Sequence, residues 1–157
     1  MIDTIQDLAT HEIINSLTYM QLSHELSLAG LTNLAKYYEE WSLEERIHNS
    51  WCREFAEQFN FKISINNIPS INLDIEDITH FYEVSQKAEL ETNKLWQNAL
   101  DKAYNEEDYG ILTNWIKGVF LKEQREETGK MQDLIDKCKP FTGNLALLHL
   151  FDQNFSG

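Results

Sequence analysis

The sequence has 157 residues and a net charge of −13, from 26 acidic and 13 basic side chains. This length is typical of a single domain with a sizeable hydrophobic core, and the charge excludes binding to nucleic acid or an anionic membrane, because both would repel the chain. Cations are the ligands that this charge favours, although solubility explains an acidic surface equally well.

The remaining composition points to long helices in a reducing compartment. Only two prolines and six glycines interrupt the chain, and no run is apolar enough to cross a bilayer. The N-terminal segment lacks the basic start of a signal peptide, and Cys52 and Cys138 do not form a disulfide framework. We therefore expect an all-α, cytoplasmic protein without a membrane partner.

The first predicted helix covers about residues 3–28 and ends before Gly30, a residue type that often follows a helix. Its inward face would be mainly apolar and would contain one carboxylate: Ile5, Leu8, Glu12, Ser16, Tyr19 and Leu26. A second stripe on this helix is more than a monomeric bundle needs and predicts a subunit interface: Ile13, Leu17, Met20, His24 and Leu28.

The second predicted helix, at about residues 32–59, has Thr32 as its expected N-cap and would lie antiparallel to the first. Its inward stripe is Leu34, Tyr38, Trp41, Glu45, His48, Cys52, Phe55 and Phe59. Glu45 and His48 lie in the middle, where an uncompensated carboxylate would be costly. A metal ion would compensate it, since carboxylate and imidazole suit iron, manganese or zinc. The alternative is a chance pair on a solvated face, which the flanking aromatic residues disfavour.

A long connection at about residues 60–76, with Pro69 and no helical period, can span the full length of the second helix. Asp77 would cap a third helix at about 77–104, and a link at 105–108 would lead into a fourth at about 109–137. Short, long and short connections predict a single domain, residues 1–157, with a ferritin-like four-helix bundle fold and one long crossover.

Within the third helix, Glu89 and Glu91 could both face inward; we choose Glu89, in the stripe Tyr82, Ser85, Glu89, Thr92, Trp96, Leu100 and Ala103. The fourth helix has the stripe Leu112, Ile116, Phe120, Gln124, Glu127, Met131 and Leu134. We explain Gly118 in this helix by close packing, because glycine there costs about 1 kcal/mol relative to alanine. The apolar tail predicts a short fifth helix, at about 144–154, packed on the bundle or on another subunit.

The polar interruptions of these stripes repeat between the two hairpins. Each hairpin supplies one lone carboxylate and a pair of polar residues three apart: Glu12 with Glu45 and His48, and Glu89 with Gln124 and Glu127. The separations are also similar, because Glu12 to Glu45 spans 33 residues and Glu89 to Gln124 spans 35. This layout is that of ferritin-like dinuclear carboxylate sites.

Nearly the whole chain resembles the non-haem ferritins of bacteria. The segments that carry the resemblance are HEIINSLTYMQLS, EEWSLEERIH and FLKEQREE, with weaker similarity in DYGILTNW and LHLFDQNF. The resemblance implies a ferroxidase that oxidises Fe(II) with dioxygen or peroxide and stores ferric mineral in a homo-oligomeric cage of 24 subunits. It also implies two irons per subunit, the first held by Glu12, Glu45 and His48 and the second by Glu89, Gln124 and Glu127, with Glu45 as a bridge.

The resemblance also implies roles for other residues. Tyr19 would donate an electron beside the irons, and the alternative is a core tyrosine whose hydroxyl has a hydrogen-bond partner. A third iron position would use Glu44, Glu123, Glu126 and Glu127, and for the first three of these a solvated acidic face is the alternative. Bacterioferritins are similar but carry a second Glu-x-x-His pair, where this chain has Gln124 and Glu127. A neutral amide oxygen is a poorer iron ligand than imidazole or carboxylate, so the second iron should be held loosely. The same difference from bacterioferritins implies that no haem is bound. We interpret Cys52, one turn from His48, as a small hydrophobic residue and not as a ligand.

Two other function classes stay open at this point. A dimeric di-iron oxidase or peroxidase of the rubrerythrin type would use the same bundle, but that family usually has a second Glu-x-x-His pair and a Cys-x-x-Cys segment, which this sequence lacks. A metal-free structural bundle would use the polar residues only to satisfy one another. The oxidant, the reductant that releases iron and the mixing of subunits are not indicated by the sequence.

Overall fold

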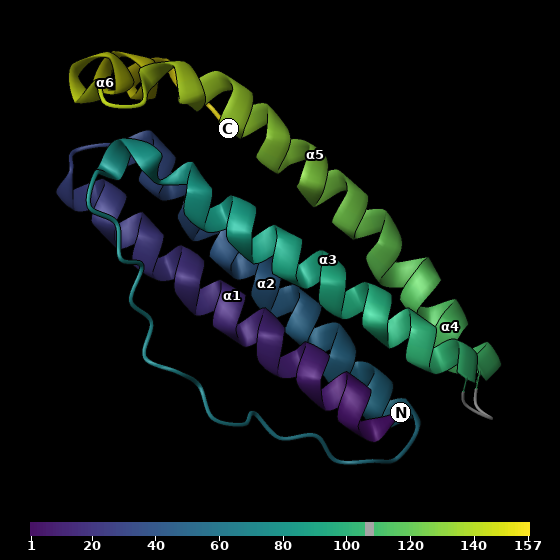
Figure 1. Ribbon diagram of the computed structural model, residues 1–157. Coiled ribbons are helices and arrows are strands. Elements are labelled where there is room, and N and C mark those ends of the chain that lie inside the picture. Colours follow the sequence, from purple (N-terminus) through teal and green to yellow (C-terminus); the bar gives the residue numbers. More distant parts are fainter. Residues whose placement is uncertain (106–108) are drawn as a thin grey trace.

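The computed structural model describes residues 1–105 and 109–157, and the described chain is helical without strands (Figure 1). Its four long segments are α1 (Ile2–Leu28), α2 (Thr32–Gln58), α3 (Tyr82–Asn105) and the continuous run from α4 (Tyr109–Trp115) to α5 (Leu121–Cys138). The short helix α6 (Leu145–Asn154) lies at the end of the bundle away from the N-terminus. The predicted ferritin-like bundle with a short C-terminal helix is thereby confirmed.

The long crossover follows α2 and runs along the outside of α1 back to the other end of the bundle (Figure 1). The side chain of Gln6 holds it there, because Gln6 Oε1 accepts a hydrogen bond of 2.6 Å from the backbone N–H of Ser64. The two hairpins therefore have the expected connection. The predicted link at 105–108 lies, apart from Asn105, outside the described residues.

The third helix starts later than expected. Asp77 does act as a cap, with Oδ1 accepting hydrogen bonds from the N–H and the hydroxyl of Thr79, but it caps only a short 3-10 turn, η1 (Ile78–His80). The regular helix begins at Tyr82, not at 77. Within this tighter start Thr79 and Phe81 are buried, so the turn places Phe81 in the core before α3 begins.

The link between α1 and α2 confirms the role of Gly30 and corrects that of Thr32. Gly30 has φ +77°, the left-handed conformation that glycine adopts without strain. Thr32 is the first helical residue, not the N-cap. Instead, the buried carboxylate of Asp152 on α6 accepts hydrogen bonds from the N–H groups of Asn33 (3.3 Å) and Leu34 (2.7 Å). The C-terminal helix thus caps α2, and its Leu148 is fully buried.

The fourth long segment contains a π-helical turn, η2 (Ile116–Phe120), where a continuous α-helix was expected. Its inward stripe explains the turn, because Leu112, Ile116, Phe120 and Gln124 are spaced by four residues three times. Three α-helical turns take only about 10.8 residues, and a wider turn keeps all four side chains on the buried face. The explanation of Gly118 by close packing is wrong, because a Cβ there would meet no described residue outside the adjoining helix backbone within 4 Å.

The hydrophobic core has two halves separated by a polar layer. One half is built around Tyr19, Leu26, Trp41 and Leu134. The other is built around Leu8, Phe55, Trp96 and Phe120. Along each helix, the carboxylates of the predicted stripes, with His48 and Gln124, lie between the residues of the two halves. The fold therefore encloses these polar groups on both sides with apolar side chains.

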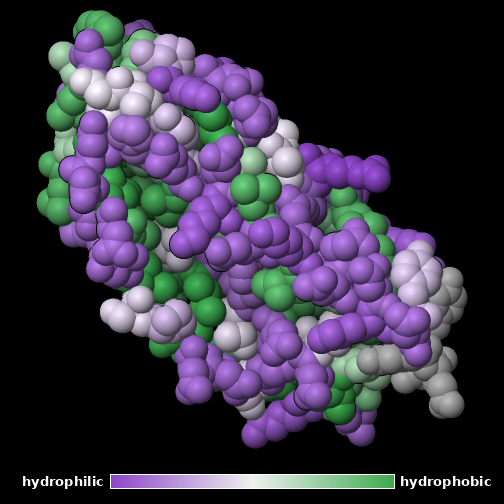
Figure 2. Space-filling view, in the orientation of Figure 1, coloured by the Kyte–Doolittle hydropathy of each residue, from purple (hydrophilic) through white to green (hydrophobic). Residues whose placement is uncertain are grey.

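The face seen in Figure 2 is mainly hydrophilic, with more hydrophobic residues toward the end that carries α6. Several large apolar side chains are nevertheless exposed, among them Met20 and Leu28 on α1, Ile47 on α2 and Leu150 on α6. None of the helices within residues 1–105 and 109–157 has the length and apolar character needed to span a bilayer.

Candidate metal centre

The polar layer consists of six side chains from four helices: Glu12 of α1, Glu45 and His48 of α2, Glu89 of α3, and Gln124 and Glu127 of α5. All six are buried, with relative exposures from 0 % for Glu12 and Glu89 to 6 % for Gln124. Each comes from the predicted inward stripe of its helix. The structure therefore brings together all six residues that the resemblance assigned to two irons.

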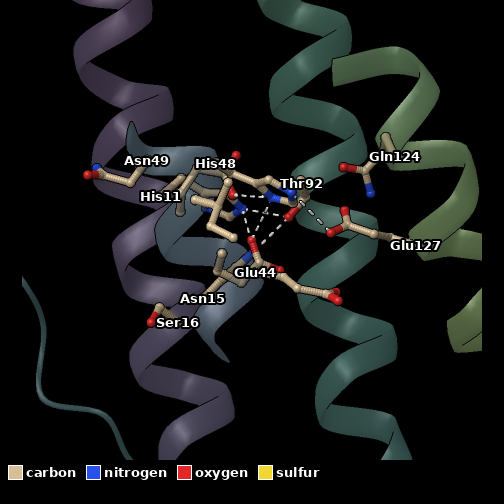
Figure 3. Close-up of polar contacts among 12 residues, drawn as sticks. His11, Asn15, Ser16, Glu44, His48, Asn49, Thr92, Gln124 and Glu127 are labelled. Atoms are coloured by element: carbon tan, nitrogen blue, oxygen red, sulfur yellow. Dashed lines mark hydrogen bonds and ion pairs between the residues drawn. The ribbon is translucent and has the colours of Figure 1, made fainter. Parts of the chain in front are cut away.

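His48 lies at the centre of the first group. Its Nδ1 is 3.2 Å from Glu45 Oε2 and 3.8 Å from Glu12 Oε2, and its Nε2 is 3.5 Å from Glu127 Oε1. Figure 3 shows the last of these contacts, with His48 and Glu127 approaching each other from α2 and α5. One imidazole thus links carboxylates from three different helices.

Glu89 lies at the centre of the second group. Its Oε1 accepts a hydrogen bond of 2.5 Å from the Tyr19 hydroxyl, and its Oε2 accepts one of 2.8 Å from Gln124 Nε2. Glu91, the alternative in this helix, is exposed. The register of α3 therefore places Glu89, and not Glu91, in the layer.

The donor atoms fit a divalent cation. Ligand atoms of Glu12, Glu45 and His48 all lie within 4.8 Å of one another, as do those of His48, Glu123 and Glu127. Within the described residues, the buried Glu12 Oε2 and Glu127 Oε1 accept no hydrogen bond and have only the longer contacts with His48. A buried carboxylate oxygen without a partner is unfavourable, and a cation of the iron, manganese or zinc type would give both oxygens a partner.

Burial shapes the protonation of this layer. It raises the pKa of Glu89 to about 7, with the Glu45 carboxylate as a second cause. Burial likewise raises the pKa of Glu45 and of Glu127. Burial alone would lower the pKa of His48, but the Glu12 and Glu45 carboxylates raise it above its ordinary value. Without a cation, the layer therefore favours protonated carboxyl groups and a charged imidazole.

The residues predicted for a third iron are only partly brought together. Glu123 is half-buried and joins His48 and Glu127 in one potential ligand group. Glu44 is half-buried and forms an ion pair with Lys130, at 3.6 Å from Oε2 to Nζ. Glu126 is exposed. Of the described residues, neither Glu44 nor Glu126 belongs to a potential metal group.

The supporting roles of the residues around the layer were not predicted from the sequence, although Ser16 and Trp96 were placed on inward faces. Trp96 Nε1 donates a hydrogen bond of 3.2 Å to Glu12 Oε1, and Asn49 Nδ2 donates one of 2.7 Å to the carbonyl of Ala9. Ser16 and Ser42 bond to each other and to each other's carbonyl across α1 and α2. The sequence pattern that could have identified some of them is the presence of small polar residues at inward helix positions beside the proposed ligands.

The fold and the layer together define a ferritin-like bundle with a buried group of carboxylates and a histidine that could hold a metal ion. The profile of the family described as "Ferritin-like domain" matches residues 2–141. The chain is 29% identical over 129 residues to "Ferritin-1, chloroplastic" of Brassica napus, which covers 79% of this chain and 50% of that protein. It thus spans about half the length of this curated relative.

Solved structures of ferritins are also similar to this chain in fold. An open pore ferritin from the archaeon Archaeoglobus fulgidus has a TM-score of 0.89 at 16% identity, covering 98% of this chain and 94% of that one. A variant of PmFTN soaked in iron has a TM-score of 0.90 at 19% identity, covering 99% and 98%. The chain belongs to the ferritin family.

Proposed function

We propose that the protein is an iron-storage ferroxidase, which oxidises Fe(II) at the polar layer and stores the ferric product in a cage of 24 copies. The observation that carries the proposal is the position of His48 between Glu45 and Glu127. Next to it, the buried Glu12 Oε2 and Glu127 Oε1 accept no hydrogen bond from the part of the chain that the structure describes. Donors from separate helices thus meet at one place where cations would complete their coordination.

In this proposal each ligand has a distinct role. Glu12, Glu45 and His48 hold the first Fe(II), and Glu45 also reaches the second, which Glu89, Gln124 and Glu127 hold. The four carboxylates balance the charge of two divalent ions, so that the loaded layer buries no net charge. Gln124 donates its amide N–H to Glu89, which leaves a neutral carbonyl oxygen as its only ligand atom. Because that oxygen binds iron weakly, the second ion is released readily, as a substrate in transit must be.

A third iron position is part of the proposal, built from Glu123 and Glu127 next to His48. Glu44 and Glu126 would have to turn toward this position to serve it, because Glu44 pairs with Lys130 and Glu126 is exposed. Dioxygen and peroxide both remain candidates for the oxidant.

The cage is supported by the exposed apolar residues of this chain, which an assembly would cover: Met20, Leu28, Leu43, Ile47, Leu147 and Leu150. Twenty-four chains of 18.4 kDa would have a mass of about 440 kDa. We place the protein in the cytoplasm, and the two buried free thiols, Cys52 and Cys138, agree with a reducing compartment.

Anaerobic titration with Fe(II), followed by exposure to air, tests the proposal. We expect two Fe(II) bound per chain and a transient visible absorbance, and both should be lost in Glu45→Ala and His48→Ala. Glu91→Ala is the matched control, because Glu91 is exposed on the same bundle and should leave the binding unchanged. Light scattering then separates the rival classes. A dimer that still oxidises iron indicates a rubrerythrin-type oxidase, and a protein that binds no iron indicates a structural bundle.

A further inference from the structure

A cleft opens on the side of the bundle where α1, α3 and the crossover meet. Its volume is about 410 Å³, and its walls come from α1, from α3 and from residues 69–73 of the crossover. Two of its wall residues reach into the bundle, because Asn15 is buried and His11 is half-buried. The cleft therefore extends from the protein surface toward the interior of the bundle.

Three hydrogen-bonded side chains close the inner end of this cleft. Thr92 of α3 is buried, and its Oγ1 lies 2.8 Å from His11 Nε2 and 2.9 Å from Asn15 Nδ2 (Figure 3). The Thr92 hydroxyl donates its only proton to the carbonyl of Ala88, at 3.0 Å. Both nitrogens therefore donate to Thr92 Oγ1, and the neutral imidazole of His11 keeps Nδ1 as an acceptor.

These three side chains lie at the level of the candidate metal centre. His11 directly precedes Glu12, and Asn15 follows Glu12 by three residues on the same helix. Thr92 follows Glu89 by three residues, and both are buried on the inward face of α3. Residues three apart on a helix are neighbours, with Cβ atoms about 5–6 Å apart. The cluster of His11, Asn15 and Thr92 therefore stands between the cleft and the carboxylates.

We propose that this cluster is the passage through which hydrogen peroxide reaches the candidate metal centre, and that peroxide is the preferred oxidant. The inference rests on the proposed ferroxidase function and selects between its two oxidants. Passage requires the three side chains to part, which breaks hydrogen bonds between buried groups. Hydrogen peroxide both donates and accepts hydrogen bonds and can replace each of them as it passes. Dioxygen cannot donate, and it would leave these buried groups unpaired.

The number of electrons also favours peroxide. Two Fe(II) ions give one electron each to one molecule of hydrogen peroxide. Its O–O bond breaks, and two protons from solvent complete two molecules of water, which leaves two Fe(III) ions. Dioxygen needs four electrons and four protons to reach the same product, so a pair of Fe(II) ions would convert it only to hydrogen peroxide. Two irons therefore match one peroxide molecule.

Iron has a separate approach on the opposite side of the bundle. Because α1 packs against α2 and α3, and α3 packs against α5, the helices α2 and α5 lie away from the cleft. On their side the half-buried Glu123 joins Glu127 and His48 in a potential ligand group, and carboxylates attract cations. The passage itself contains no carboxylate, and in the cleft the ammonium group of Lys87 offsets the carboxylate of Glu91. The cleft thus suits a neutral solute better than a cation.

The test compares the two oxidants on the full-length assembled protein, loaded anaerobically with two Fe(II) per chain. Stopped-flow absorbance gives the rate of iron oxidation at equal concentrations of hydrogen peroxide and of dioxygen. For the wild type we expect the ratio of the peroxide rate to the dioxygen rate to exceed one. Thr92→Val keeps the shape of the side chain without its hydroxyl, and Asn15→Leu removes the amide. Each should lower the ratio by about tenfold or more.

Two further variants are the controls. Thr92→Ser keeps the hydroxyl and should keep the wild-type ratio. Thr10→Val removes a hydroxyl that likewise bonds to the carbonyl four residues earlier, at 2.9 Å from Gln6 O. Because Thr10 is half-buried on α1 outside the cleft, the ratio should not change. Circular dichroism and anaerobic Fe(II) titration show whether the fold and the centre persist; if one of the two apolar variants does not fold, the other decides.

An unchanged ratio in Thr92→Val and Asn15→Leu would overturn the passage, whether both oxidants react more slowly or neither does. A wild type that reacts faster with dioxygen than with peroxide would overturn the preference for peroxide. A wild type that neither binds Fe(II) nor oxidises it with either oxidant would refute the proposed function itself.

Discussion

Trp96 on α3 donates a hydrogen bond from Nε1 to Glu12 Oε1 on α1, over 3.2 Å, whereas Glu12 Oε2 faces His48 and accepts no hydrogen bond from the described residues. Phe120, at the end of the π-helical turn, stacks on the Trp96 ring, with centroids 3.5 Å apart. The turn in the fourth helical segment therefore fixes the orientation of Glu12 through one aromatic contact and one hydrogen bond.

Replacing Trp96 should consequently weaken the first iron position without removing a ligand. We expect Trp96→Phe to reduce Fe(II) affinity by about 1.5–3 kcal/mol, the usual range for a hydrogen bond to a charged group. Anaerobic calorimetry measures the change. Trp115→Phe is the control, since Trp115 packs in the same aromatic group. Equal affinity of Trp96→Phe and the wild type would show that the indole does not position Glu12.

The metal-free protein should become less stable as pH rises. The pKa of Glu89 in the folded state, about 7, lies above its ordinary value of 4.5 because of burial. Between these values the folded state binds more protons than the unfolded state, so the free energy of unfolding falls with rising pH. His48 acts in the same direction, because the nearby carboxylates raise its pKa as well. We expect a loss on the order of 2–3 kcal/mol for Glu89 between about pH 5 and about pH 8.

Urea unfolding at several pH values measures this slope. Glu89→Gln should flatten it, whereas Glu91→Gln should not, because Glu91 is exposed. Saturation with Zn²⁺, which is not oxidised, should also remove the slope, since a bound cation stabilises the ionised carboxylates. A metal-free protein whose stability rises through this pH interval would contradict the burial argument.

Removal of the cap that α6 provides to α2 should destabilise the bundle. Asp152 accepts hydrogen bonds from the N–H groups of Asn33 and Leu34, and its negative charge lies at a helix N-terminus. We expect Asp152→Ala to lower the free energy of unfolding by about 1–2 kcal/mol. The neighbouring exposed Gln153 gives the control variant Gln153→Ala. Two variants of equal stability would mean that the cap contributes nothing.

Two glycines should respond in opposite ways to alanine. Gly118 has a negative φ and open space around its Cβ position, so Gly118→Ala should stabilise the protein by about 0.5–1 kcal/mol. Gly30 has φ +77°, and its Cβ would lie 3.0 Å from His149 Cε1, so Gly30→Ala should destabilise it. Thermal unfolding of both variants measures the difference. A destabilised Gly118→Ala would indicate that the π-helical turn requires glycine.

The sequence predicted the polar layer because its signal is periodic. Glu45 and His48 share one helix face with aromatic residues, and spacing alone shows this. The same reasoning, applied to the stripe through Tyr82 and Trp96, favoured Glu89 over Glu91, and the burial of Glu89 agrees with that choice. Helix faces are local properties, which explains why this part of the site could be predicted.

Other features depend on how distant segments meet and could not be read from local patterns. The cap of α2 comes from Asp152, which is more than a hundred residues away along the chain, so Thr32 was the natural local choice. The bond from Trp96 to Glu12 likewise depends on the packing of α3 against α1. The π-helical turn did have a local signal, the three consecutive four-residue spacings from Leu112 to Gln124, whose meaning became clear from the burial of all four residues.

Anomalous diffraction at the iron edge, from a crystal soaked anaerobically in Fe(II), tests the central claim most directly. The account predicts two iron peaks inside each bundle, one beside Glu12, Glu45 and His48 and the other beside Glu89 and Glu127. Iron found only at surface carboxylates, with no peak between the two halves of the hydrophobic core, would contradict it.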